Sequence, residues 1–279
     1  MSNEKRWNPL HDANESVRLP MRWRKPRRVI LSIDLFHEDV PFEFIDKVYA
    51  IMGLCPQHTF QVLTKRSERM AEYLRVTNRS ACIADAVRVM RLRGLGSVMD
   101  DPCELMKIGG YNLREWPLPN VWLGTSVEDQ KAADERIPHL LRCPAAVRFL
   151  SCEPLLGEVD VSAFVGTRLH PQDIEGGWKC ADRWVIVGGE SGPGARPCRV
   201  EHIYSIVRQG KGSGTPVFVK QLGARPVQVN HGPEMPMRWV PDDGGEAIER
   251  WYKPRDRKGA DPAEWPEDLR VREMPGVSR

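Results

Sequence analysis

The residues of this chain whose types could do chemistry stand directly after short apolar runs. The candidate catalytic residues are Asp34, His37, Glu128 and Glu153. The candidate ligand-binding residues are Lys65, Ser126, Ser151, Gly188, Gly189, Glu190, Ser191, Lys220 and Gln221. Any one polar strand end means little, but six converging ends predict a ligand site rather than a purely structural polar layer.

The side-chain types suggest different roles at such a site. Lys65 and Lys220 can hold an anion such as a phosphate or a carboxylate. The glutamates can bind an amino group or a metal, or act as bases, although Glu153 precedes a proline and can simply end its strand. Asp34 and His37 can form a proton-transfer pair, with a surface position leading into a helix as the alternative for His37.

The most conspicuous of these segments is the glycine-rich loop 188–194 (GGESGPG). Glycine lets a backbone approach a ligand closely and adopt positive φ. The loop lacks the Gly-Lys-Ser/Thr of a phosphate-binding P-loop and the spacing of a dinucleotide fingerprint. Arg196 and Arg199 follow it and can add contacts to an anion.

Six apolar runs must position these residues, and each reads as a buried strand. The runs cover residues 29–33, 59–63, 121–124, 147–150, 184–187 and 216–219. Their apolarity is continuous rather than alternating, which is typical of parallel strands covered on both faces. Helical patterns at 42–52, 67–74, 81–92, 128–141 and 200–209 lie between them. This order predicts a parallel α/β fold with outer helices, in which ligands bind beyond the carboxyl ends of the strands.

The pattern divides the chain into a main domain and an extension. Residues 1–225 hold the strand–helix units, with an inserted helical segment at about 76–119. From residue 226 onward eight prolines interrupt the periodicity, which predicts an irregular C-terminal extension.

Positive and negative charges nearly balance over the whole chain, but basic residues are concentrated around residues 22–28. The net charge of +3 predicts no strong general attraction to nucleic acid or membrane. A basic stretch surrounds Trp23 and makes a nucleic-acid contact one alternative, the other being a solvated lead-in to the first strand. Its residues are Arg22, Arg24, Lys25, Arg27 and Arg28.

The seven cysteines form no C-x-x-C pair, so neither a zinc site nor a disulfide framework is predicted. Cys152 sits at a strand end, where a small buried residue is favoured over a nucleophile. Reduced thiols, the lack of a long apolar run and the lack of a charged-then-apolar leader together predict a cytoplasmic protein.

Five strings, taken together, resemble the phage gp-thirty-seven/gp-sixty-eight family. They are 34–41 (DLFHEDVP), 61–66 (QVLTKR), 120–128 (NVWLGTSVE), 148–156 (RFLSCEPLL) and 184–192 (WVIVGGESG). That family is similar to radical S-adenosylmethionine proteins, so the resemblance implies an incomplete (β/α) barrel. It also implies three cysteines near the start that ligate a [4Fe–4S] cluster, whose open iron binds S-adenosylmethionine.

The chain departs from this pattern where the cluster would be held. The three cysteines should precede Arg22, but the first cysteine is Cys55. The string Trp7-Asn8-Pro9 resembles the opening that stands ahead of the cysteine loop in the family. We therefore predict a chain without the cluster and without a metal site.

Three functions follow as hypotheses. The first is a phage or prophage-type barrel that keeps a pocket for a nucleotide-like or S-adenosyl ligand. The second is a hydrolase or lyase that uses the strand-end carboxylates and lysines without a cluster. The third is a nucleic-acid-binding module, and a protein partner that completes the site is compatible with each.

Overall fold

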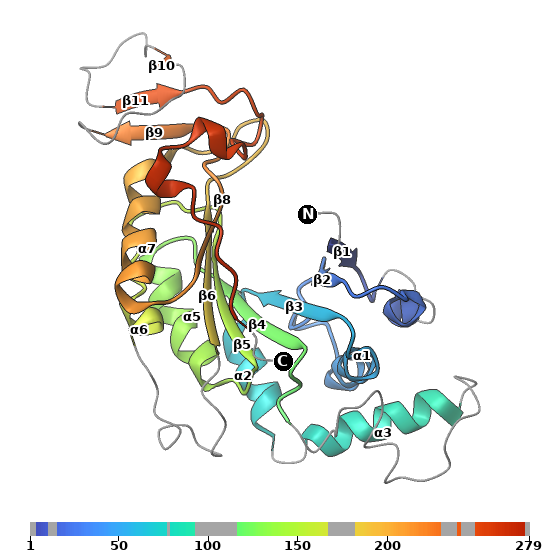
Figure 1. Cartoon of the computed structure of the whole chain (residues 1–279). Helices are drawn as coiled ribbons and strands as arrows, with labels where there is room; N and C mark the ends of the chain where they lie inside the picture. Colours follow the sequence, from blue (N-terminus) through green and yellow to red (C-terminus); the bar gives the residue numbers. More distant parts are fainter. Residues whose placement is uncertain are drawn as a thin grey trace. The chain divides into compact units, whose positions relative to one another are not determined.

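The structure is a computed structural model of the whole chain (Figure 1). It describes residues 4–10, 16–76, 79–92, 116–166, 182–229, 239–240 and 249–276. The chain divides into two compact units. One comprises Met1–Thr125 and His139–Arg148, and the other comprises Ser126–Pro138 and Phe149–Arg279.

The main sheet has seven strands in the order β1-β2-β3-β4-β5-β6-β8. The strands are β1 (Glu4–Trp7), β2 (Arg28–Leu31), β3 (Thr59–Thr64), β4 (Val121–Ser126), β5 (Val147–Cys152), β6 (Asp182–Gly188) and β8 (Val217–Gln221). The pairs β1–β2, β2–β3, β3–β4 and β6–β8 are parallel. All six predicted strands are present, and the predicted α/β fold of the incomplete β/α-barrel kind is confirmed.

In the first unit, helices follow β2 and β3, and their core includes the buried Tyr49 and Tyr73. They are α1 (Phe42–Leu54), α2 (Ser67–Arg75) and α3 (Arg79–Leu92). The Tyr73 hydroxyl donates to Asp46 at 2.8 Å, and Arg79 donates to the same oxygen at 3.0 Å. These buried polar groups are therefore satisfied by one another. Of the predicted insertion, α3 is described and residues 93–115 lie outside the described part of the chain.

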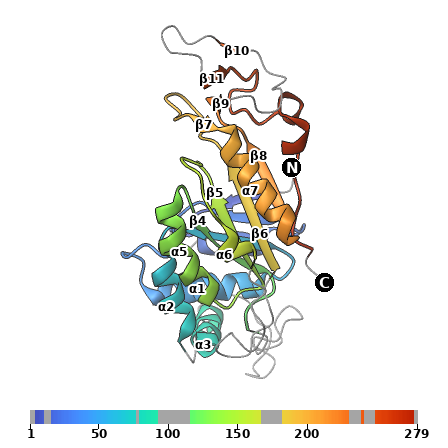
Figure 2. The same cartoon turned by 90° about the vertical axis from the view of Figure 1, so that its left-hand side faces the viewer.

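In the second unit, helix α7 (Val200–Ser213) lies along β6 and β8 (Figure 2). The sequence predicts that this helix ends at Gly210, but it continues to Ser213 and ends at Gly214, whose φ is 70°. Gly210 serves packing instead, because a Cβ there would collide with the side chain of Val217. Among the described residues, the remaining α-helices are α5 (Gln130–Arg142), whose last residues belong to the first unit, and the short α6 (Ser162–Val165).

The proline-rich C-terminal region contributes regular structure. A second sheet has the order β10-β11-β9-β7, formed by Trp239–Val240, Glu249–Tyr252, Pro226–Val229 and Cys198–Arg199. The 3-10 turns η4 (Pro262–Glu264) and η5 (Glu267–Leu269) follow, and Trp265 between them is fully buried. Where the sequence predicts an irregular extension, the described residues therefore form strands and a packed turn region.

No helix among the described residues is both long and apolar enough to cross a membrane.

Candidate functional site

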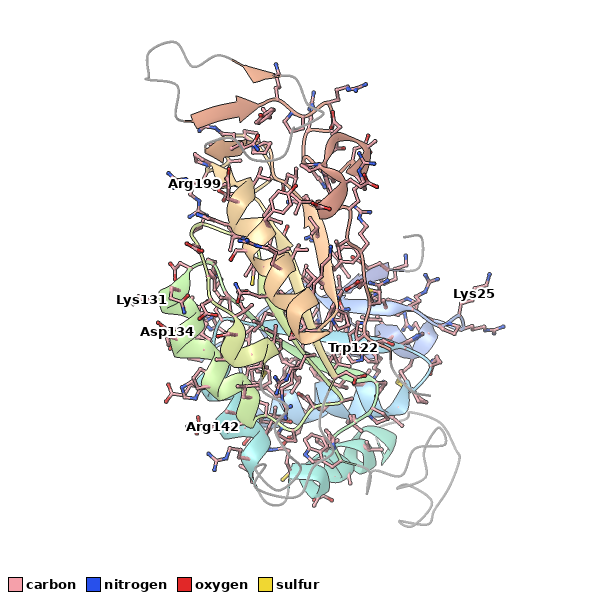
Figure 3. All side chains as sticks on the ribbon, turned by 60° about the vertical axis from the view of Figure 1, so that its left-hand side comes forward. Lys25, Trp122, Lys131, Asp134, Arg142 and Arg199 are labelled. Carbon is pink, nitrogen blue, oxygen red and sulfur yellow. The ribbon has the colours of Figure 1, made fainter. Side chains whose placement is uncertain are left out.

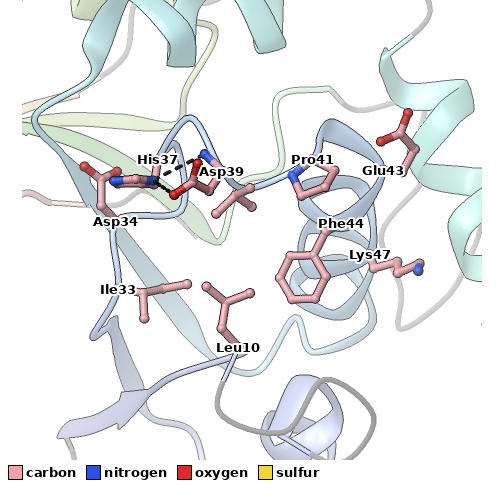
Figure 4. A pocket seen from close by; sticks show the side chains of 10 residues that line it. Leu10, Ile33, Asp34, His37, Asp39, Pro41, Glu43, Phe44 and Lys47 are labelled. Carbon is pink, nitrogen blue, oxygen red and sulfur yellow. Dashed lines mark hydrogen bonds and ion pairs between the residues drawn. The ribbon is translucent and has the colours of Figure 1, made fainter.

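A pocket of about 770 Å³ opens in the first unit, just beyond the carboxyl end of β2 (Figure 4). Its apolar lining comes from Leu10, Ile33, Val40, Pro41 and Phe44. Its polar lining comes from Asp34, His37, Asp39, Glu43 and Lys47. Two of the predicted catalytic residues, Asp34 and His37, thus line one pocket at the end of a parallel strand, where α/β folds bind ligands.

Asp34 fixes one wall of this pocket. Its Oδ1 accepts hydrogen bonds from the Thr64 hydroxyl at 2.6 Å and the Phe36 amide at 3.1 Å, and its Oδ2 accepts one from Arg66 Nη1 at 2.8 Å. These bonds join the end of β2 to the end of β3 and the start of α2. The arginine also offsets the charge of this carboxylate.

His37 lies in the loop that follows. Its Nδ1 stands 3.3 Å from both the amide nitrogen and Oδ2 of Asp39. Its backbone amide donates to the backbone carbonyl of Asp34 at 3.1 Å. The ring's partner in the structure is therefore Asp39, whereas Asp34 holds the backbone of the same loop.

A second arginine, Arg69 of α2, clamps this loop through its backbone carbonyls. Arg69 donates from Nη1 to the His37 carbonyl at 3.0 Å and from Nη2 to the Val40 carbonyl at 2.9 Å. Its guanidinium lies 4.5 Å above the Phe42 ring. Two forked donors and a stacked ring hold the backbone more rigidly than a point charge would. The pocket wall is therefore formed before any ligand arrives.

The sequence placed Arg66 at a strand end, as a possible nucleic-acid contact, but did not identify its bond to Asp34, the role of Arg69 or the apolar wall. Phe44 belongs to the apolar stripe of a predicted helix, so its periodicity indicated core packing. Leu10 is 45% exposed and precedes the first predicted strand. The available signal was that Arg66 and Arg69 stand one helical turn apart immediately after a strand end.

The remaining ligand-binding candidate of the first unit, Lys65, follows the end of β3. Lys65 is exposed, and its backbone amide lies 3.5 Å from Asp34 Oδ2. The adjacent Thr64 hydroxyl both donates to Asp34 and accepts from the Arg66 amide at 2.9 Å. The structure thus brings Asp34, His37 and the backbone of Lys65 into one neighbourhood.

In the second unit, each candidate glutamate has its own cationic partner. Glu153 accepts from Lys220 Nζ at 2.7 Å, and Glu128 accepts from Arg136 at 2.8 Å. Glu190 accepts from the backbone amide, Nε and Nη2 of Arg196. The Arg196 side chain, followed by its backbone amide, lowers the pKa of Glu190 to about 2. The three carboxylates are therefore ion-paired acceptors in this state.

Backbone hydrogen bonds join the strand ends of the second unit. Val127 directly follows Ser126, the last residue of β4, and its amide donates to the Ser151 carbonyl of β5. The Leu155 amide, beyond the end of β5, donates to the Gly188 carbonyl of β6. The Gly189 amide donates to Gln221 at 3.0 Å, and the Gln221 side chain donates back to the Gly189 carbonyl at 2.8 Å. This brings the ends of β4, β5, β6 and β8 side by side.

The glycine-rich loop owes its first two glycines to these contacts. A Cβ at Gly188 would meet the Gln221 carbonyl at 2.9 Å, and one at Gly189 would collide with the Leu222 carbonyl. Close backbone packing therefore accounts for both glycines. Ser191 lies beyond them, exposed at the surface.

Five cysteines lie in the described part of the chain; Cys82 is exposed and the other four are buried. Burial raises the pKa of Cys55, Cys143, Cys152 and Cys198 to about 12, and Glu128 adds to the effect at Cys152. Nucleophilic cysteines react as thiolates, and the apolar surroundings of these four residues disfavour the thiolate. Within the described ranges no group of three His, Cys, Asp or Glu residues is arranged to hold a metal, and Cys103 and Cys180 fall outside them.

The basic stretch runs up to Arg28, the first residue of β2, and is partly exposed. Arg22, Arg24 and Lys25 are exposed, whereas Arg27 and Arg28 are half-buried. Figure 3 shows Lys25 extending away from the ribbon. The stretch therefore presents charge to solvent.

Comparison with curated proteins and with solved structures gave no match. A family model described as "Protein of unknown function (DUF5131)" matches residues 3–258. Because that match covers nearly the whole chain, the protein belongs to this family.

Proposed function

We propose that this protein binds a small nucleoside-type molecule in the pocket beyond β2. The observation that carries the proposal is the pocket itself: about 770 Å³, with apolar walls and a few polar groups on rigid backbone. That volume and lining are typical of small-molecule sites. Phe44 and the aliphatic residues offer a surface for a planar base, and the carboxylates offer acceptors for hydroxyl and amino groups.

The charges at the pocket edge favour an S-adenosyl compound over a polyphosphate. The charge of Asp34 is offset by its ion pair with Arg66. The other charged lining residues are the acidic Asp39 and Glu43 and the basic Lys47, so negative charge is in excess. Carboxylates repel phosphate and attract a sulfonium or an ammonium group. The sequence resemblance to the phage gp-thirty-seven/gp-sixty-eight family, which is similar to radical S-adenosylmethionine proteins, supports the same ligand class.

Calorimetric titration with S-adenosylmethionine, S-adenosylhomocysteine, adenosine and ATP tests this proposal. Leu10→Arg places bulk and positive charge in the pocket. Leu156→Arg is the control, because Leu156 lies outside the pocket lining and is 37% exposed, close to the 45% of Leu10. We expect S-adenosyl compounds to bind more tightly than ATP. We expect Leu10→Arg to weaken that binding about tenfold or more, because the ligand would no longer cover the apolar surface of this leucine. Unchanged binding in Leu10→Arg, or no binding of any of the four compounds, contradicts the proposal.

A hydrolase or lyase remains the alternative that uses the second unit. Its best-placed groups are Glu153 and Lys220, because the lysine is 52% exposed and the glutamate 17% exposed. A substrate anion would have to displace the glutamate from the lysine. Turnover that is lost in both Glu153→Gln and Lys220→Met, but retained in Leu10→Arg, would favour this alternative.

The exposed basic stretch supports the third hypothesis, nucleic-acid binding. Lys25→Glu and Lys131→Glu change the net charge equally, and both lysines are exposed in Figure 3. Binding through the basic stretch predicts salt-sensitive affinity that falls only in Lys25→Glu. Equal loss in both variants would indicate a general charge effect instead.

A further inference from the structure

His37 and Asp39 form a polar pair at the edge of the pocket beyond β2. The ring nitrogen Nδ1 of His37 stands 3.3 Å from the Asp39 amide nitrogen and 3.3 Å from Asp39 Oδ2, the two contacts that Figure 4 marks with dashed lines. The ring also lines the pocket, so its second nitrogen, Nε2, is the one that a bound ligand can meet. An imidazole held in this way beside a carboxylate can carry a proton and pass it to the ligand.

The backbone that carries this pair is held in place. Arg69 donates to the His37 and Val40 carbonyls at 3.0 Å and 2.9 Å, and the Val40 amide donates to the His37 carbonyl at 2.9 Å. The neighbouring Asp34 already accepts hydrogen bonds through both carboxylate oxygens, including one from Arg66 Nη1 at 2.8 Å. Asp34 is therefore fixed as an acceptor, and His37 is the side chain of this loop that can give a proton.

The charges of the pocket favour a reaction in which positive charge develops on the ligand. With Asp34 paired to Arg66, the acidic Asp39 and Glu43 outnumber the basic Lys47 in the lining. Such an excess stabilises a cation-like transition state and destabilises an anionic one. The N-glycosidic bond of a nucleoside breaks through a ribosyl oxocarbenium ion, which is cation-like. Attack on a carbonyl, in contrast, builds negative charge on oxygen.

We propose that the pocket hydrolyses the N-glycosidic bond of the adenine nucleoside that it binds, with His37 as the general acid and Asp39 as its positioning residue. This inference rests on the proposed binding of a nucleoside-type ligand. The bond between C1′ and adenine N9 breaks, its electron pair leaves with the base, and a ring nitrogen of the base takes a proton from His37 Nε2. Water adds to C1′ and releases a proton to the solvent, from which the imidazole is protonated again. S-adenosylhomocysteine and water then yield adenine and S-ribosylhomocysteine.

Chromatography of the adenine released from S-adenosylhomocysteine, together with calorimetric titration, tests the proposal. His37→Gln removes the proton donor and keeps a polar side chain. His139→Gln is the control, because His139 is likewise half-buried and lies outside the pocket lining. We expect His37→Gln to lower the rate of adenine release about 100-fold, the contribution typical of a general acid, and to change the Kd by less than about threefold. The control should match the unaltered protein.

Asp39 acts through the imidazole, so its substitution should matter chiefly while His37 is present. Its side chain is 87% exposed, and solvent screens its direct effect on charge in the pocket. We expect Asp39→Asn to lower kcat about tenfold in the unaltered protein and less than about twofold in the His37→Gln background. Equal losses in both backgrounds would refute the positioning role.

The failure of this reaction can be told apart from the failure of the ligand site. If S-adenosylhomocysteine binds without releasing adenine, or if His37→Gln releases adenine at the unaltered rate, the hydrolysis is refuted and the ligand site stands. If S-adenosylhomocysteine neither binds nor releases adenine, the proposed ligand site fails and the hydrolysis with it. Adenine release that is lost in Leu10→Arg as well as in His37→Gln supports both.

Discussion

Arg66 Nη1 lies 2.8 Å from Asp34 Oδ2 and so fastens the start of α2 to the end of β2. The same carboxylate also receives the hydroxyl of Thr64 and the amide of Phe36. Three residues, Phe36, Thr64 and Arg66, therefore donate hydrogen bonds to this one side chain. These hydrogen bonds therefore help to fix the shape of the adjacent pocket.

Replacing Asp34 should cost more stability than replacing its neighbour in the same loop. Asp34→Ala leaves Arg66 and Thr64 without their acceptor, and we expect a loss of about 2 kcal/mol in the free energy of unfolding. The Asp39 side chain is 87% exposed, so Asp39→Ala should change it by less than about 0.5 kcal/mol. Urea denaturation measures both, and equal losses would show that Asp34 is not the junction described.

Arg69→Lys should loosen the loop that forms the pocket wall. Lysine cannot donate to the His37 and Val40 carbonyls at once, nor stack flat on Phe42. We expect the Val40 amide, which donates to the His37 carbonyl, to exchange about tenfold faster, as a local loss of about 1.4 kcal/mol implies. The exposed Arg142→Lys is the control and should leave that rate unchanged. Equal rates in both variants would disprove the clamp.

Two glycines of α7 should respond to alanine in opposite ways. At Gly210 a Cβ would collide with the buried Val217 side chain and lie 3.0 Å from the Thr215 carbonyl, so Gly210→Ala should cost about 1–3 kcal/mol. At Gly212 nothing lies within 4 Å, so Gly212→Ala should stabilise the helix by about 0.5–1 kcal/mol. Thermal unfolding measures both. Shifts of the same sign would contradict the packing of α7 on β8.

Stability should fall at alkaline pH because of the buried thiols. Burial raises the pKa of Cys152 from 9.0 to about 12, so the folded state keeps a proton that the unfolded state releases. The thiol's contribution is fully present below pH 9 and is lost as the pH rises to 12, with a slope of about 1.4 kcal/mol per pH unit for one proton. Cys152→Ala should remove one such contribution and flatten the decline. Unfolding measured from pH 8 to pH 11 that declines equally in both proteins would contradict this.

The sequence predicted the elements whose signal is local and apolar. The strands β2, β3, β4, β5, β6 and β8 are continuous apolar runs, and each was located. Strand β1 was missed because Glu4, Lys5 and Arg6 are exposed and charged, which leaves Trp7 as its one buried residue. The second sheet was missed for a related reason: its strands are two to four residues long and lie among prolines.

The candidate site was only partly accessible from sequence for a different reason. Strand ends identify Asp34 and His37 because position in a parallel fold follows from the strand pattern. How α1 and α2 pack decides which backbone carbonyls Arg69 reaches and whether Phe44 lines the pocket. Packing of this kind is set by tertiary contacts that no local period encodes.

Amide exchange with and without saturating S-adenosylmethionine tests the central claim most directly, because it reports where the ligand lies. We predict protection in the peptides that span residues 33–47 and none in those that span the glycine-rich loop 188–194. Protection confined to the glycine-rich loop, or no protection anywhere in the chain, would contradict the assignment of the pocket beyond β2 as the ligand site.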